Sequence, residues 1–326
     1  MSDTATPARH ADPVDPGDPL DSAPRGSGAR WVTPIFWLNW AVEIGIIVTG
    51  GLVRLTGSGL GCPTWPQCVP GSYTPTREMA MGIHPYIEFG NRLLTFVVAI
   101  AAIGVLWSVH RPLRHRRGLR LPAWLLFAGI VVQAVVGGIS VRVDLNPFVV
   151  SVHFLVSAAL VAVSTYLLVR LREGDEPPRL LVHPLVVRAA WVTAALAAVV
   201  IVLGTFVTGS GPHSGDAEKP DRNGLDPRMI SWLHADAVML FVGLAVAVWL
   251  ACRLTTDAVR SASGRADVTG PTTAWTLVLA VTLAQGVIGY GQFFSGLPVP
   301  LVLIHMLLAA LFAAAVTNGV LALRRR

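Results

Sequence analysis

The chain of 326 residues is 53% hydrophobic and only 13% charged, with a mean hydropathy of +0.60. Soluble domains are about 45–50% apolar, so this composition excludes an ordinary soluble fold and indicates a protein that lies in lipid. The formal net charge of +6 could suggest a nucleic-acid partner. The basic residues instead lie mostly on one side of the predicted membrane spans, so no nucleic-acid partner is expected.

Residues 1–30 are rich in Asp, Pro, Gly and Ser and carry few apolar side chains. Such a segment buries too little apolar surface to fold, so we expect a disordered tail here. The tail also lacks the apolar stretch of a cleavable signal peptide.

Eight apolar stretches follow in chain order, each close to the roughly 20 residues that a helix needs to cross a bilayer. We therefore predict an all-α, polytopic membrane protein of eight transmembrane helices. The predicted spans are Ile35–Leu55, Pro85–Val109, Leu121–Val141, Pro147–Arg170, Leu185–Thr208, Met229–Cys252, Thr272–Phe294 and Val299–Leu323.

Most Lys and Arg residues lie on one side of these spans. Arg111 to Arg120 separate the second and third spans, Arg170 to Arg188 surround the fourth connection, and Arg324 to Arg326 end the chain. The positive-inside rule places this side in the cytoplasm. We expect both termini to be cytoplasmic, in a multi-pass protein of the cell membrane.

The two halves of the chain match at a constant offset of 152 residues. Thr56–Gly59 recurs as Thr208–Gly211, and Gln133 to Gly137 recurs as Gln285 to Gly289. Each half holds four predicted helices, an even number, so both copies have the same orientation and an axis along the membrane normal relates them. The sequence predicts two tandem four-helix bundles, over residues 31–175 and 176–326, with a pseudo-twofold axis.

Three histidines lie about five residues into predicted spans four, six and eight: His153, His234 and His305. An ionisable residue inside a span is a functional candidate by default. For one isolated histidine, a hydrogen bond to a nearby carbonyl explains the residue equally well. Histidines recurring at one depth on facing helices favour a cofactor site inside a bundle, and two imidazoles can be the axial ligands of heme. Zinc would need further ligands close by.

Other ionisable residues give weaker signals. Glu43 lies inside the first span without an evident partner, and its role is left open. Arg54, Arg142 and Arg228 lie near span ends, where they either pair with carboxylates such as heme propionates or extend to the interface. The remaining histidines fall in tails or loops and receive no role: His10, His110, His115, His183 and His213.

Cys62 and Cys68 share the first external loop. Because the oxidising side of the membrane permits disulfides, we favour a disulfide or redox pair over a metal site.

The run from Gly50 through Arg54 to Cys68, followed by Glu88-Phe-Gly-Asn-Arg92, resembles heme A synthase, and the similarity covers about residues 31–323. The resemblance implies oxidation of the C8 methyl of heme O to a formyl group, giving the heme A of cytochrome c oxidase. The methyl would be oxidised twice, to an alcohol and then to a geminal diol that loses water. The resemblance also implies a prosthetic heme b between His234 and His305, and a substrate heme in the N-terminal bundle with His153 as one ligand.

In the second span the family pattern is Glu-x-x-His-Arg, which Glu88 and Arg92 match, whereas Asn91 stands in place of the histidine. Either His84, seven residues earlier on the same helical face, is the second ligand of the substrate heme, or the iron is five-coordinate on His153. We favour His84. Glu88 is the candidate catalytic group because a carboxylate near the porphyrin could take up protons or stabilise positive charge. It could equally be an ion-pair partner of Arg92.

Two other classes of function compete with this enzyme. A diheme b-type electron carrier, such as a quinol oxidoreductase subunit, needs two permanent bis-histidine hemes, and Asn91 makes the N-terminal pair imperfect. A transporter is disfavoured because the spans are not broken at midplane. For the enzyme we expect as partners membrane lipid, an electron donor or acceptor, and the enzyme that produces heme O.

Overall fold

The computed structural model describes residues 30–76, 82–213, 215–216, 220–263 and 270–326. The tail expected at residues 1–30 therefore lies, apart from Arg30, outside the described residues. Across the described residues there are eight helices that are long and apolar enough to cross a membrane. The prediction of an all-α, polytopic membrane protein is confirmed.

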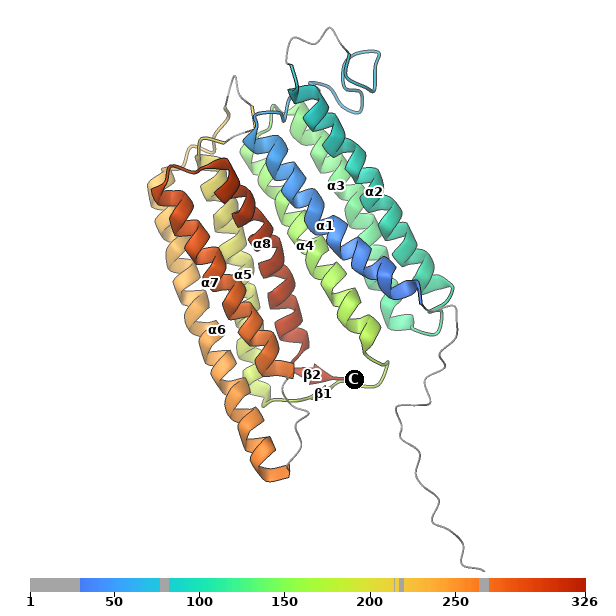
Figure 1. The fold of residues 1–326 in the computed structure, drawn as a ribbon, viewed down its shortest axis with the longest axis vertical. Coiled ribbons are helices and arrows are strands. Elements are labelled where there is room, and N and C mark those ends of the chain that lie inside the picture. The colour runs from blue at the N-terminus through green and yellow to red at the C-terminus, as the bar shows by residue number, and fades with distance from the viewer. Residues whose placement is uncertain (1–29, 77–81, 214, 217–219, 264–269) are drawn as a thin grey trace, which may run out of the picture.

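The helices fall into two successive groups of four (Figure 1). A short 3-10 helix, η1 (Arg117–Leu119), precedes α3, and two short strands, β1 (Arg179–Leu180) and β2 (Arg324–Arg325), pair with each other. The long helices are α1 (Val32–Leu55), α2 (His84–His110), α3 (Arg120–Arg142), α4 (Pro147–Arg172), α5 (Pro184–Ser210), α6 (Pro227–Ser263), α7 (Gly270–Phe294) and α8 (Val299–Leu321).

Local sequence explains where several helices begin. Proline occupies the first turn of α2, α4, α5 and α8, where its missing N–H costs nothing. Asn146 caps α4 by accepting a hydrogen bond from the backbone N–H of Phe148 at 3.1 Å, and Asp226 accepts one from Met229 at 2.7 Å at the start of α6. These caps satisfy backbone donors that the first helical turn leaves unpaired.

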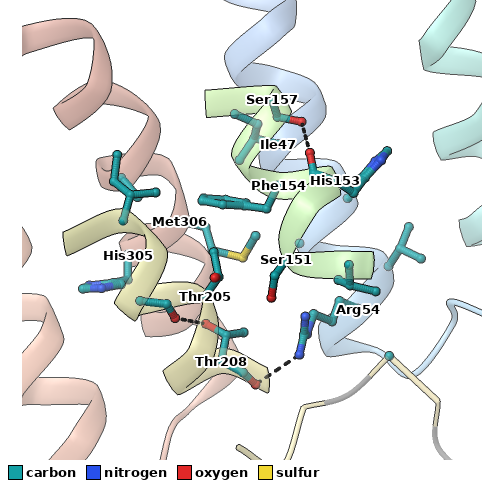
Figure 2. Close-up of a pocket in the computed structure, with 18 of the residues that line it drawn as sticks. Ile47, Arg54, Ser151, His153, Phe154, Ser157, Thr205, Thr208, His305 and Met306 are labelled. Atoms are coloured by element: carbon teal, nitrogen blue, oxygen red, sulfur yellow. Dashed lines mark hydrogen bonds between the residues drawn. The ribbon is translucent and has the colours of Figure 1, made fainter. Parts of the chain in front are cut away.

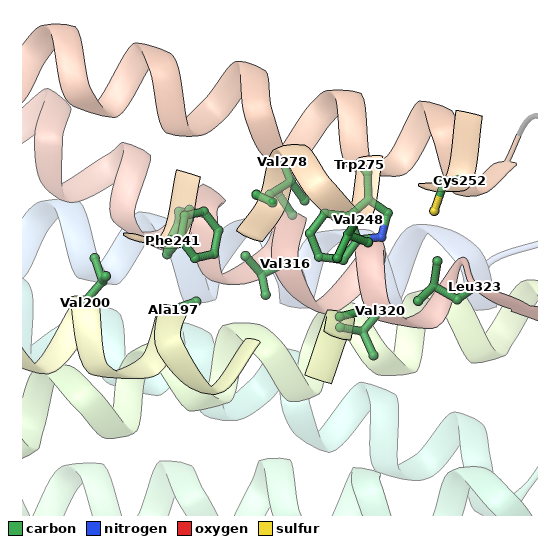
Figure 3. Close-up of a cluster of buried hydrophobic side chains, with 14 of the residues drawn as sticks. Ala197, Val200, Phe241, Val248, Cys252, Trp275, Val278, Val316, Val320 and Leu323 are labelled. Atoms are coloured by element: carbon green, nitrogen blue, oxygen red, sulfur yellow. The ribbon is translucent and has the colours of Figure 1, made fainter. Parts of the chain in front are cut away.

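Within each group the helices pack in sequence, and the fourth returns to the first: α4 packs on α1, and α8 packs on α5. We call α1–α4 the N-terminal bundle and α5–α8 the C-terminal bundle. The C-terminal core is built around Phe241 and Trp275, both fully buried, and the Trp275 indole donates to the carbonyl of Gly319 at 3.1 Å (Figure 3). The core of the N-terminal bundle lies around Phe36, Leu119 and Leu126.

The two bundles meet along a seam formed by three helix pairs, α4 with α8, α1 with α8, and α4 with α5. Its apolar centre consists of Ile44, Ile47, Val161, Ala310 and Ala314. Helix α8 approaches α1 closely at Gly51, where an added Cβ would lie 2.6 Å from the Met306 sulfur. The absence of a side chain at Gly51 gives the Met306 thioether room to pack against α1. The pseudo-twofold axis remains a prediction.

Contacts at both ends of the molecule also join the bundles. At the end that carries the first loop (residues 56–76), Arg54 donates to the carbonyls of His213 at 2.6 Å and Thr208 at 3.0 Å. At the opposite end β1, in the connection between the bundles, pairs antiparallel with β2 at the C-terminus. The start of α1 and the C-terminus share this second end (Figure 1).

Candidate heme-binding site

A cavity of about 1310 Å³ runs through both bundles, and all eight helices contribute side chains to its wall. This volume exceeds the roughly 300–1,000 Å³ of a pocket for one drug-sized ligand. The cavity wall includes His153, His234 and His305. The structure thus brings the three helical histidines of the sequence analysis to one continuous space.

The seam crosses this cavity, and we call the parts on its two sides the N-terminal and the C-terminal compartment. Phe154 of α4 and Met306 of α8 lie between His153 and His305, whose imidazoles point away from each other (Figure 2). Phe154 and Met306 also pack against the buried side chains of the seam. One compartment therefore lies in each bundle, with His153 in the N-terminal one and with His234 and His305 in the C-terminal one.

Each of the three imidazoles packs against a glycine of the preceding helix. A Cβ added at the glycine would lie 3.1 to 3.3 Å from the Cε1 atom of the ring, which is tighter than an ordinary contact. The pairs are Gly137 with His153, Gly204 with His234, and Gly289 with His305. Because a methyl group would push the ring away, these glycines set the position of the imidazoles.

The donor set fits heme. The Nδ1 atoms of His153, His234 and His305 are buried and, among the residues the structure describes, form no close hydrogen bond, although the rings of His234 and His305 lie near the backbone at Val200 and Gln285. A buried ring nitrogen without a close partner is costly, and neutral imidazole is a common metal ligand. Helices α6 and α8 lie diagonally opposite in the C-terminal bundle, so His234 and His305 approach one compartment from two sides, as axial ligands of a heme do.

In the N-terminal bundle, α2 is the helix diagonally opposite α4. Asn91 of α2 lines the cavity and lies beside Gly50 of α1. Its Oδ1 accepts a hydrogen bond from the Thr49 hydroxyl at 2.8 Å. His84 does not line the cavity; its Nδ1 lies 2.8 Å from the Ser58 hydroxyl at the start of α2. The structure therefore does not bring His84 together with His153.

Glu88 and Arg92 line the cavity and also fix the first loop. The Glu88 carboxylate accepts from Arg92 at 2.5 and 3.0 Å through one oxygen, and from the backbone N–H of Cys62 at 2.6 Å through the other. Arg92 further donates to the carbonyls of Cys62, Thr64 and Gln67. Glu88 is 6% exposed and Arg92 is partly exposed, so the ion pair is a partly buried anchor between loop and bundle.

Cys62 and Cys68 form a disulfide, as predicted, and both are fully buried. The segment that they close is the one whose carbonyls Arg92 holds. The disulfide and the Glu88–Arg92 pair therefore brace the same loop over the N-terminal compartment, whose wall includes Trp65 of that loop.

Comparison with known proteins decides the family. The model of a family described as cytochrome oxidase assembly protein matches residues 33–317. This chain belongs to the cytochrome oxidase assembly protein family.

Heme A synthases of several bacteria are similar to parts of this chain. The heme A synthase of Lysinibacillus sphaericus is 34% identical over 125 residues, 37% of this chain and 39% of that protein. Those of Listeria monocytogenes (30% over 121 residues; 37% and 38%) and Geobacillus kaustophilus (29% over 141 residues; 42% and 42%) are also similar. The chain thus spans about two fifths of the length of these relatives. They confirm the resemblance to heme A synthases.

Four other charged residues of this family member were candidates from the sequence: Arg54, Arg142, Arg228 and Glu43. Arg54 holds backbone carbonyls of the C-terminal half, and Arg142 lies over the Trp65 ring and donates to its carbonyl at 3.1 Å. Arg228 is exposed and lines the cavity. Glu43, 2% exposed, also lines the cavity, and its Oε1 has no partner among the described residues.

Sequence reasoning missed several residues that shape the site. Thr49 and the pair Phe154 and Met306 carry no ionisable group, so they did not stand out. The repeat could have indicated the pair, because Met306 follows Phe154 at the same offset of 152 that relates His153 to His305. His183, assigned no role, caps α5 by accepting a hydrogen bond from the N–H of Leu185.

Proposed function

We propose that this chain is a heme A synthase that oxidises the C8 methyl of heme O to a formyl group. The observation that carries this proposal is a family member's large cavity lined by three histidines whose Nδ1 atoms are buried and whose rings each pack on a glycine. Heme O is the substrate, and heme A, the product, serves cytochrome c oxidase.

In this proposal the C-terminal compartment holds a prosthetic heme b between His234 and His305. Heme bound there supplies one-electron redox chemistry. Each imidazole would be held against its own glycine, Gly204 or Gly289, and the apolar core beneath would exclude water. Phe154 and Met306 separate this compartment from the substrate compartment.

Substrate heme binds in the N-terminal compartment on His153. With water as the source of oxygen, each of the two oxidations passes two electrons to the expected electron acceptor and releases two protons near the macrocycle edge. The methyl becomes an alcohol and then a geminal diol, which loses water to give the aldehyde. Glu88 lies in the compartment wall, and its carboxylate is held in place by Arg92 and the Cys62 N–H. We assign it the role of accepting these protons or stabilising positive charge at the reacting carbon.

The proposal includes the setting of the enzyme. The distribution of Lys and Arg favours a cell membrane location with both termini in the cytoplasm, so the disulfide loop faces the oxidising side. The enzyme that makes heme O and an electron donor or acceptor are the expected partners. The units 31–175 and 176–326 then have separate tasks, substrate binding and electron transfer.

The test is chromatography of hemes extracted from cells that express the full chain beside a heme O-producing enzyme. We expect heme A only when both proteins are present. A chain in which His153 is replaced by Ala serves as the control and should leave heme O unconverted. If heme A is absent while two low-spin b hemes are present, the diheme electron carrier is the better description and the proposal is wrong.

A further inference from the structure

The four helix hairpins of the molecule share one local arrangement. In each, a glycine of the odd-numbered helix lies beside a cavity-lining polar side chain of the following even-numbered helix. The pairs are Gly50 with Asn91, Gly137 with His153, Gly204 with His234, and Gly289 with His305. Asn91 thus takes in the first hairpin the place that an imidazole takes in the other three.

The amide of Asn91 is oriented by its neighbour. The hydroxyl of Thr49, one residue before Gly50, donates to Asn91 Oδ1 at 2.8 Å, the shorter of its two contacts with an acceptor; the other is the carbonyl of Ile46 at 3.2 Å. The Nδ2 end lies by Gly50, 3.9 Å from the position of an added Cβ, and no described protein group accepts a hydrogen bond from it. Opposite His153, the compartment therefore presents a hydrogen-bond donor rather than a second nitrogen base.

No other histidine can take the position opposite His153. His84, on the same helix, begins α2 outside the cavity and is engaged with Ser58. His305 lies beyond Phe154 and Met306 (Figure 2), and His234 lines the cavity from α6 of the same bundle as His305. In the described part of the chain, His153 is thus the single imidazole of the N-terminal compartment.

From this asymmetry we infer that the N-terminal site binds a small diatomic ligand, of the class of dioxygen and carbon monoxide, on the open face of a heme held by His153 alone. The inference rests on the proposed function, which places heme in this compartment. A five-coordinate heme has a vacant axial position, and a nearby hydrogen-bond donor favours a bound diatomic ligand. Asn91 Nδ2 is that donor. The C-terminal heme, with both axial positions filled by His234 and His305, does not bind such a ligand.

The experiment uses the full chain, purified in detergent and loaded with heme. The heme content per chain is counted first, the protein is reduced with dithionite, and carbon monoxide is the probe. We expect two hemes per chain, one of which changes its spectrum with carbon monoxide while the other stays low-spin. Asn91→His should abolish the carbon monoxide response and make both hemes low-spin. Asn318→His, the same change on α8 outside the cavity, should leave the response intact.

A second variant separates the effect of the open axial position from the effect of the Asn91 amide. Asn91→Leu keeps the position open, so carbon monoxide should still bind, but it should dissociate about tenfold faster because the donor is lost, a change of about 1.4 kcal/mol. Two hemes with no carbon monoxide response, or an unchanged response in Asn91→His, would overturn the inference alone. A single heme per chain that is lost in His305→Ala would instead contradict the substrate site of the proposed function, and the inference with it.

Discussion

The two bundles hold the same repeated residues in different hydrogen-bond settings. Gln285 of α7 lies with its Nε2 3.2 Å from Nε2 of His305. Its counterpart in the N-terminal bundle, Gln133, donates instead to the hydroxyl of Ser157. The residue at the position of Ser157 in the second copy is Ala309, which has no hydroxyl to offer. A single serine thus leaves His153 without the glutamine contact that His305 has.

The loops that cover the two bundles are also held in different ways. The first loop is braced by a disulfide and by the Glu88–Arg92 pair. The loop after α5 has no cysteine in its sequence; it is tied by Asn223, which donates to the carbonyl of Phe206 at 2.8 Å. This difference fits the proposed function, in which the C-terminal bundle holds a permanent heme between two histidines and the N-terminal bundle, with one histidine and a braced cover, holds a ligand that enters and leaves.

The largest effect is expected from loss of a histidine in the C-terminal site. His234→Ala or His305→Ala should remove the low-spin, six-coordinate heme b spectrum, because each variant loses one of two axial ligands. His153→Ala should keep that spectrum. Visible and electron paramagnetic resonance spectra of the purified proteins check this. An unchanged low-spin signal in both C-terminal variants would show that these histidines do not hold the heme.

The next largest effect is expected in the N-terminal site, where a variant of Glu88 tests whether the carboxylate takes part in the reaction or only stabilises the structure. Glu88→Gln keeps the shape of the side chain and removes its charge, so we expect little or no heme A, retained heme b, and accumulation of the partly oxidised hydroxymethyl heme. Hemes and protein yield are measured on the same membranes.

A matched control for this variant is Glu173→Gln, which breaks the buried ion pair with Arg170 at the far end of the molecule. It should leave heme A output unchanged. If Glu88→Gln lowers protein yield and heme b together, the carboxylate acts only through the Arg92 pair. Normal heme A output would remove Glu88 from the mechanism.

A smaller effect is expected from loss of the Cys62–Cys68 disulfide, which braces the first loop. Cys62→Ser should destabilise the loop by about 2 kcal/mol, the chain-entropy value for so short a closed segment, and lower heme A output while heme b stays bound. Alkylation of membranes without reductant, followed by mass spectrometry, should find Cys62 and Cys68 unlabelled. Full alkylation of both would contradict the disulfide, and labelling of Cys68 from the cytoplasmic side would contradict the orientation.

The smallest effect concerns the glycines behind the imidazoles. Gly289→Ala places a methyl 3.2 Å from Cε1 of His305, and such overpacking costs about 1–3 kcal/mol. We expect a displaced ring, a shifted heme b spectrum and weaker heme retention. Gly286→Ala, one turn earlier on α7, meets nothing within 4 Å and is the control. Equal spectra for the two variants would show that the glycine does not position the histidine.

The eight helices could be predicted because each needs a long apolar stretch, and their observed ends lie close to the expected ones. The exception is α6, which continues to Ser263; its final residues are polar, and apolar content cannot report a helix that extends beyond the bilayer. The depth of the three histidines also followed from their place in each span. The disulfide followed from two cysteines in one loop.

The surroundings of His84 could not be predicted. Its spacing of seven residues from Asn91 places both on one helical face, but the first loop folds over the start of α2, and Ser58 meets His84 there. The Thr49–Asn91 contact likewise depends on how α1 packs against α2. Helical periodicity describes one helix at a time, whereas these contacts depend on where two segments meet.

The seam between the bundles has the helix pairing of a dimer interface: α4 meets its own repeat counterpart α8, and α1 with α8 is matched by α5 with α4. In a homodimer, every substitution appears in both subunits, so a histidine lost from one site is lost from its mate. Joining the halves in one chain lifts that constraint and makes their association independent of protein concentration. Asn91 and Ser157 are changes of this kind, present in one half only. In the proposed function, covalent linkage thus permits one half to hold a prosthetic heme and the other to exchange a substrate heme.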